Sequence, residues 1–126
     1  MNPWLTEVLD AHVAIENWLS AGHGDLAPLV ARFSPHYSMI TLAGTRLDLN
    51  ALHQFFAAQR ASRPGLRISV DQLKLVAEFE NGAVVQYREQ QVQPGQAATT
   101  RWSTVVFRRE SGQLRWLHLQ ETLQSS

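Results

Sequence analysis

The stretch TRWSTVVFRRESGQLRWLHLQET, residues 100–122, decides the fold. Two runs rich in Val, Thr, Phe, Trp and Leu flank Ser111-Gly112, which is the pattern of a β-hairpin. Two further turn signals, Asn81-Gly82 and Pro94-Gly95, divide the sequence before it in the same way. The second half of the chain therefore predicts four β-strands, over residues 66–80, 83–92, 98–109 and 113–123.

The first half of the chain begins with a helical pattern. Apolar side chains from Trp4 to Trp18 recur at alternating spacings of four and three residues. Pro3 suits a first helical turn and Gly22 offers a stop, so the spacing predicts a helix over about 3–20. A shorter helix is expected over 26–33, with Asp25 as its cap.

The segment SPHYSMITLAGTRL, residues 34–47, predicts a strand and a tight turn at Ala43-Gly44. Asn50 is the expected cap of a third helix that runs to about Ser62. On that helix an apolar set is expected to face inward, namely Leu52, Phe55 and Phe56.

Helices followed by a long strand meander indicate an α+β fold. We expect N-terminal helices packed in the concave face of a strongly curved, mostly antiparallel sheet. A chain of 126 residues is the size of one domain, so residues 1–126 are read as a single unit.

The amino-acid composition excludes several classes of partner and site. Eleven Lys plus Arg balance eleven Asp plus Glu, so no basic field favours nucleic acid. The absence of cysteine excludes disulfides and thiolate metal sites. Glu7 and Asp10 fall in an N-terminal stretch without a basic start or a long apolar run, so we expect neither a signal peptide nor a membrane span. A cytoplasmic location follows by default.

The turns also predict which residues lie opposite each other. A loop centred on Gly95 pairs Glu89 with Arg101 and Tyr87 with Ser103. A three-residue loop over 110–112 then pairs Arg101 with Glu121, Ser103 with Leu119 and Val105 with Leu117. The prediction is a row of Glu89, Arg101 and Glu121 on the inner face, beside Tyr87.

The same alternation predicts a mixed aromatic outer face that includes Trp102, Trp116 and His118. Such a face suits a protein interface, with Arg88 opposite Trp102 in reach of a cation–π contact. His118 has no second histidine or carboxylate at ligand spacing, so no metal site is expected.

With these residues placed, the chain resembles the nuclear transport factor 2-like superfamily, in the SnoaL-like group that includes the association domain of calmodulin-dependent kinase. The resemblance extends over nearly the whole chain and is carried by three segments: YSMITLAGTRLDLNALHQFF, FENGAVVQYREQQ and TRWSTVVFRRESGQLRWLHLQET. It implies a cone-shaped α+β barrel with a pocket inside, and commonly a homodimer through the outer sheet face.

The resemblance does not carry an enzyme's catalytic residues across. Ketosteroid isomerases hold a general base on the first strand, where this chain has Thr41. Limonene epoxide hydrolases use two aspartates and an arginine; Glu89, Arg101 and Glu121 are similar in charge but lie one per strand. In the kinase association domain the positions of the two glutamates carry arginines, so an anion preference does not transfer.

The candidate site is therefore the Glu89, Arg101 and Glu121 cluster, with Tyr87 and Ser103 beside it. Tyr37 at the start of the first strand and His12, one position off the helical stripe, are further ligand-binding candidates, although solvent exposure is the default for His12. The expected ligand is small and largely apolar. One alternative is a cofactor-free lyase, isomerase or hydrolase in which a glutamate moves a proton. The other is a purely structural charge network.

Overall fold

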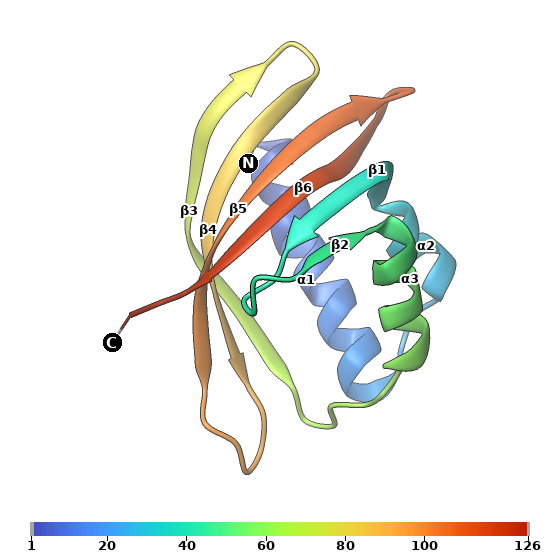
Figure 1. Cartoon of the computed structure of the whole chain (residues 1–126), viewed down its shortest axis with the longest axis vertical. Coiled ribbons are helices and arrows are strands. Elements are labelled where there is room, and N and C mark those ends of the chain that lie inside the picture. Colours follow the sequence, from blue (N-terminus) through green and yellow to red (C-terminus); the bar gives the residue numbers. More distant parts are fainter. Residues whose placement is uncertain (1, 126) are drawn as a thin grey trace.

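A computed structural model describes residues 2–125 and contains three helices and one mixed sheet of six strands. The elements are α1 (Pro3–Ala21), α2 (Leu26–Ala31), β1 (Phe33–Ile40), β2 (Arg46–Asp48), α3 (Leu49–Ala58), β3 (Arg67–Phe79), β4 (Gly82–Val92), β5 (Thr99–Glu110) and β6 (Gln113–Leu123). The strand order is β2-β1-β6-β5-β4-β3, and only the β1–β6 pair is parallel. Figure 1 shows a strongly bent, open sheet with the helices on one side. The predicted α+β fold is confirmed.

Helix α1 forms as its apolar spacing predicts. Trp4, Val8 and Trp18 are buried, and the Asn2 side chain accepts a hydrogen bond from the Trp4 backbone N–H at the first turn. The helix ends at Gly22, which has the left-handed backbone (φ 73°) that glycine adopts without strain. The buried face of α1 is thereby fixed against the sheet.

Three predicted helix boundaries differ from the structure. Phe33 begins β1 instead of ending the second helix, and α3 begins at Leu49 because the Asp48 carboxylate, not Asn50, accepts from the Ala51 N–H. The third helix also ends at Ala58, before Ser62. Phe55, expected to face inward, lines the cavity but is 46% exposed.

The hairpin of β4 and β5 has the predicted register. Glu89 lies opposite Arg101, and Tyr87 lies opposite Ser103. Because alternate residues share a face, all four side chains point to the concave side of the sheet.

The register of β5 with β6 was predicted wrongly. Glu110 pairs with Gln113, so the loop has only two residues, Ser111 (φ 52°) and Gly112 (φ 78°), both left-handed as in a type I′ turn. A bulge follows at Leu117, since Phe107 pairs with Trp116 and Val106 with His118. Each of these two features displaces the pairing by one residue.

These two displacements have different consequences along β6. Between the turn and the bulge the faces are reversed, so Trp116 points inward and is only 2% exposed. Beyond the bulge the predicted faces return, but Glu121 lies opposite Ser103, and Arg101 lies opposite Leu123. The predicted row of Glu89, Arg101 and Glu121 is therefore replaced by a row of Tyr87, Ser103 and Glu121.

The hydrophobic core fills one end of the bent sheet. Trp4 stacks on Phe107 at 5.7 Å between ring centroids, and Phe107 meets Trp116 edge-on at 4.9 Å. The other end of the concave face carries the charged side chains. Over residues 2–125, none of the helices has the length and apolar character that crossing a membrane requires.

Candidate functional site

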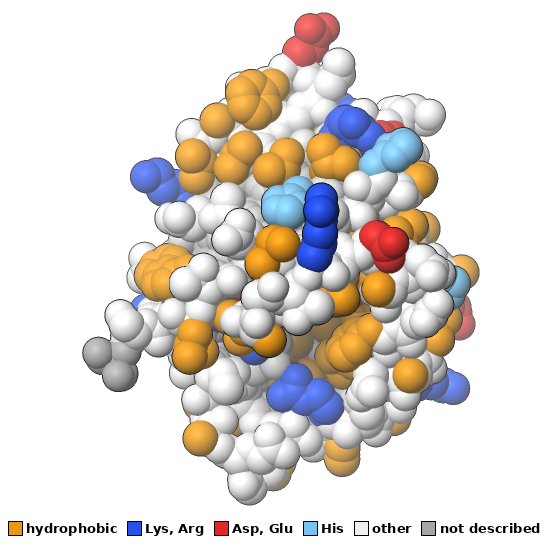
Figure 2. All heavy atoms as spheres, in the orientation of Figure 1, with side chains coloured by type: hydrophobic (Ala, Val, Ile, Leu, Met, Phe, Trp, Pro, Cys, Tyr) orange, Lys and Arg blue, Asp and Glu red, His pale blue; other side chains and the backbone are white. Residues whose placement is uncertain are grey.

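A cavity of about 300 Å³ lies between the helices and the concave face of the sheet. Such a volume is at the lower end of the range for small-molecule sites. Figure 2 shows a hollow lined by hydrophobic side chains on this side of the molecule. Much of its wall is aromatic or aliphatic, formed by Phe33, Tyr37, Met39, Leu52, Phe56 and Trp116.

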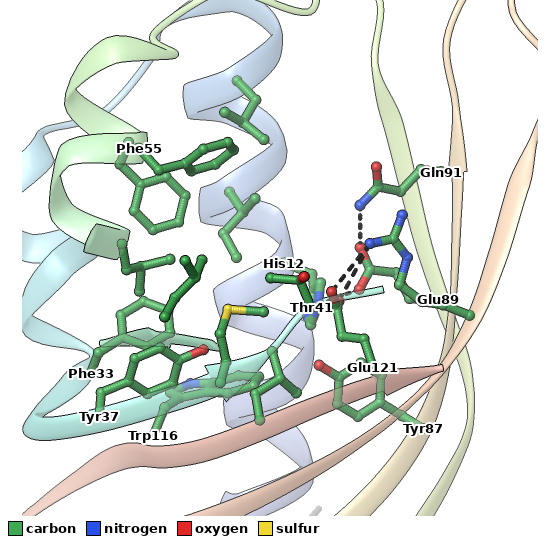
Figure 3. A pocket seen from close by; sticks show the side chains of 18 of the residues that line it. His12, Phe33, Tyr37, Thr41, Phe55, Tyr87, Glu89, Gln91, Trp116 and Glu121 are labelled. Atoms are coloured by element: carbon green, nitrogen blue, oxygen red, sulfur yellow. Dashed lines mark hydrogen bonds and ion pairs between the residues drawn. The ribbon is translucent and has the colours of Figure 1, made fainter. Parts of the chain in front are cut away.

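The opposite wall is polar, and its central contact joins α1 to β4. His12 is 6% exposed, and its Nε2 lies 3.1 Å from Oε1 of Glu89 (Figure 3). Its Nδ1 lies 2.6 Å from the Val8 carbonyl oxygen, which can only accept, so Nδ1 carries a hydrogen. An ionised Glu89 also only accepts, and therefore one further proton must lie between Nε2 and the carboxylate.

This shared proton agrees with the pKa directions. Burial disfavours the charged imidazolium, but the hydrogen bond and negative charge of Glu89 outweigh it and raise the pKa of His12. Burial likewise opposes ionisation of Glu89, yet the hydrogen bond and charge of His12 leave the pKa of Glu89 lowered. The two groups form a buried imidazolium–carboxylate pair.

Glu89 is held on its second oxygen too. The Gln91 side-chain amide donates to Oε2 at 2.7 Å, and Arg63 Nη1 donates to the Gln91 oxygen at 2.7 Å. Arg63 also lines the cavity. A continuous hydrogen-bonded chain thus runs from His12 through Glu89 and Gln91 to a guanidinium on the loop before β3.

Arg101 pairs with the other glutamate. Its Nη1 lies 3.4 Å from each carboxylate oxygen of Glu121, and both side chains are nearly buried. The contact is diagonal, from one cross-strand row to the next. The structure therefore brings Glu89, Arg101 and Glu121 to one wall, but divides them into two pairs.

The two carboxyls titrate in opposite directions. Burial raises the pKa of Glu121, Arg101 partly counteracts this, and the charge of Glu89 adds to the rise. The pKa of Glu89 is lowered, as described above. Two carboxyls with divergent pKa values in one cavity can divide the roles of proton donor and fixed anion.

Tyr87 adds a hydroxyl to this wall, and Ser103 lies opposite it on β5 without lining the cavity. Both are fully buried, and among residues 2–125 neither hydroxyl oxygen has a hydrogen-bond partner; the same holds for Arg101 Nε. Burial raises the pKa of Tyr87 and the charges of Glu89 and Glu121 raise it further, while the Ser103 hydroxyl opposite it on β5, which makes no hydrogen bond with it, lowers it in part. The Tyr87 hydroxyl is therefore a neutral donor, and Figure 3 shows it on the side of Glu121.

The remaining candidates lie where the cavity meets β1. Tyr37 is buried on the aromatic wall, and burial followed by the charge of Glu121 raises its pKa. Thr41, the residue at the position of the isomerase base, also lines the cavity. No group of three or more His, Asp or Glu side chains that could hold a metal ion occurs in the described part of the chain.

The sequence did not reveal several cavity residues. Trp116 was assigned to the outer face, and Arg63 and Gln91 had no predicted role. The one usable signal was for His12, a polar residue next to the apolar stripe of α1 and thus at the edge of its buried face.

The outer face contains two of its three predicted interface residues. Arg88 lies over the Trp102 ring at 5.8 Å from its centroid, as predicted, and Ser38 Oγ lies 2.8 Å from His118 Nδ1. Trp116 is absent from this face because the turn before it has two residues instead of the predicted three. A homodimer through Trp102 and His118 stays a prediction.

The chain is similar to several proteins of known structure. An NTF-2-like protein of unknown function from Pseudomonas aeruginosa is 41% identical, with 97% of this chain and 98% of that chain covered and a TM-score of 0.91. A cystatin-like protein of unknown function from Nostoc punctiforme is 15% identical, covers 96% and 91%, and has a TM-score of 0.73. A Thiobacillus denitrificans protein, assigned as a calcium/calmodulin-dependent kinase type II association domain, is 15% identical, covers 80% and 83%, and has a TM-score of 0.66.

The two distant structures show the fold alone. No protein with a curated function matches the sequence. The sequence profile of the SnoaL-like domain matches residues 12–123, from the cavity histidine on α1 to the end of β6. The chain therefore belongs to the SnoaL-like domain family.

Proposed function

We propose that the cavity binds a small, largely apolar molecule through its aromatic wall and holds one polar group of that molecule at the wall of Tyr87, Arg101 and Glu121. The observation that supports this most is the presence of two unpartnered buried polar atoms on residues that line the cavity, Tyr87 Oη and Arg101 Nε. A buried polar group without a partner costs about 1–3 kcal/mol. A bound ligand would supply the missing partner.

The competing explanation is a purely structural network that closes the wide end of the cone. A structural network satisfies its own polar groups, as the His12–Glu89–Gln91 chain does. Tyr87 and Ser103 gain nothing from that chain, although they lie in the adjacent cross-strand row. Ligand binding explains why these hydroxyls lack a partner within the chain, and it is also compatible with the ion pairs.

A neutral fluorescent probe tests the proposal. N-Phenyl-1-naphthylamine fluoresces strongly when it leaves water, so its titration into the protein should give saturable binding. Ile15 lines the cavity from α1, and Ile15→Trp should fill the space and abolish the signal. Val13 lies on the same helix but is 60% exposed, so Val13→Trp serves as the matched control and should bind the probe normally.

Absence of saturable binding, or equal binding by the Ile15→Trp and Val13→Trp proteins, would count against the cavity as a ligand site. Near-ultraviolet circular dichroism of both variants checks that each retains the fold. Both variants carry the same new tryptophan, so a difference in probe binding between them reports only whether the indole lies in the cavity.

A cofactor-free lyase, isomerase or hydrolase is the second candidate, and the divergent pKa directions of Glu121 and Glu89 favour it. In this function Glu121 transfers the proton and Arg101 orients it. Carbon-detected NMR titration of the side-chain carboxyls tests it. Glu121 should titrate above the ordinary range of a glutamate and Glu89 below it, and two ordinary titrations would remove the basis for catalysis.

A further inference from the structure

The hydrogen-bonding groups left free at the polar wall identify the kind of ligand group that fits there. Arg101 Nε can only donate a hydrogen bond, and the hydroxyls of Tyr87 and Ser103 can each donate one. A ligand donor would leave the guanidinium N–H unsatisfied. An acceptor oxygen, with two lone pairs, suits the free groups of this wall.

The carboxylate oxygens of the wall already accept hydrogen bonds. Both oxygens of Glu89 are bonded, one to His12 and one to Gln91, and both oxygens of Glu121 face Arg101 Nη1. The wall therefore has unused donors, while each of its carboxylate oxygens already has a partner.

The charges of the wall decide between a neutral and an anionic acceptor. The imidazolium of His12 is balanced by Glu89, and Arg101 is balanced by Glu121. The other cation that lines the cavity, Arg63, donates to Gln91 and Gln93, and Gln91 lies four residues along β4 from Tyr87. Beside Tyr87, a ligand carboxylate would add a negative charge next to the carboxylates of Glu89 and Glu121, where an uncompensated buried charge is costly. A neutral acceptor avoids this cost.

We infer that the ligand presents an uncharged carbonyl oxygen, as in a ketone, lactone or amide, to the polar wall, and that the Tyr87 hydroxyl donates a hydrogen bond to it. This inference rests on the proposed function and narrows it to a ligand class. The aromatic wall of Phe33, Tyr37 and Trp116 receives the apolar part of the same molecule (Figure 3).

Three naphthalenes with the same ring system test the inference by displacing N-phenyl-1-naphthylamine at pH 7.5. The ketone is 2-acetonaphthone, the matched hydrocarbon is 2-ethylnaphthalene, and the matched anion is 2-naphthoate. We expect the ketone to bind about tenfold more tightly than the hydrocarbon, the gain of one well-placed hydrogen bond to a buried donor. The anion should bind more weakly than the ketone.

Substitutions then assign the donor. Tyr87→Phe should remove most of the ketone's advantage and leave the affinity for 2-ethylnaphthalene unchanged. Ser103→Ala should reduce the advantage to a lesser extent, since Ser103 lies behind Tyr87 in the row and does not line the cavity. Thr104→Val removes a hydroxyl from the other face of β5 and is the matched control, with no expected effect on any of the three probes.

The outcomes separate the two proposals. If N-phenyl-1-naphthylamine binds and Ile15→Trp blocks it, yet the ketone and the hydrocarbon bind equally or the anion binds most tightly, the carbonyl inference is overturned and the proposed function stands. A ketone advantage that persists in Tyr87→Phe overturns the role of that hydroxyl. Failure of the fluorescent probe to bind the cavity overturns the proposed function, and the carbonyl inference with it.

Discussion

The two ends of the concave face differ in whether their buried polar atoms are hydrogen-bonded. At the hydrophobic end, Trp116 Nε1 donates to Glu7 Oε2 at 3.0 Å and Trp4 Nε1 donates to Glu78 Oε2 at 2.8 Å. At the polar end, the buried hydroxyls of Tyr87 and Ser103 have no partner among the described residues. The two ends belong to one continuous sheet, joined by strands β4, β5 and β6.

The hydrophobic end follows the usual rule that buried polar groups are hydrogen-bonded, and the polar end departs from it. Buried polar groups in folded proteins are almost always hydrogen-bonded, and the indoles follow this rule across long distances in sequence. The same chain therefore finds a partner for each of these two indoles, both of them buried in the core. Under the proposed function, the ligand supplies the partner that the Tyr87 hydroxyl lacks beside the cavity.

The largest expected effect comes from breaking the buried ion pair of the polar end. Glu89→Leu leaves the imidazolium of His12 without its partner and deprives Gln91 of an acceptor. Removing one member of a buried pair costs about 3–5 kcal/mol of unfolding free energy. Urea denaturation at pH 7 measures the loss.

Asp71 provides the control for this prediction. Its carboxylate pairs with Arg88 on the exposed side of the sheet, where solvent screens the charges. Asp71→Leu should therefore change the unfolding free energy far less than Glu89→Leu does. Equal losses would show that His12 and Glu89 are not a buried, mutually dependent pair.

The next largest effect belongs to the hydrophobic end. Glu7→Leu removes the acceptor of the Trp116 indole and the partner of Arg32. An unsatisfied buried donor costs about 1–3 kcal/mol, and we expect a loss of this size in the unfolding free energy. Chemical denaturation of wild type and variant gives the value, and an unchanged midpoint would mean that the indole does not depend on Glu7.

A smaller effect appears in the pH dependence of stability. Because the folded pKa of Glu121 is raised, its contribution is fully present below its unfolded pKa of about 4.3 and is lost as the pH rises through the folded value. The contribution of Glu89 has the opposite sign, since its folded pKa is lowered, and it is lost as the pH falls. Glu121→Gln should therefore gain stability relative to wild type between pH 4 and pH 7, in urea denaturation at a series of pH values. Parallel curves would contradict the raised pKa.

The sequence predicted the fold because its local signals agree with one another. The spacing on α1, the stop at Gly22 and the turn signals each fix one element without reference to the rest. The loop around Gly95 also fixed the β4–β5 register correctly, so Glu89, Arg101 and Tyr87 were placed on the inner face. Local turn chemistry was sufficient for this hairpin, whereas the loop at Ser111-Gly112 has two residues instead of the three predicted.

The features that the sequence did not predict are those that tertiary packing determines. The two-residue turn at Ser111-Gly112 brings Trp116 inward against Phe107 and Phe33, and the bulge at Leu117, which no turn residue marks, then places His118 on the outer face. The partner of Glu89 is His12, 77 residues away, and only the bend of the sheet around α1 brings them together. Neither the bulge nor this contact leaves a periodic pattern in the sequence.

The smallest expected effect is also the most direct test of the contrast between the two ends. Tyr87→Phe removes a buried hydroxyl that has no partner in the unliganded protein, so the unfolding free energy should stay the same or rise. The measurement is urea denaturation of the unliganded protein at pH 7, with wild type and Glu7→Leu measured in parallel. A loss of about 1 kcal/mol or more, the value of a satisfied hydrogen bond, would show that the Tyr87 hydroxyl serves the fold and would contradict its reservation for a ligand.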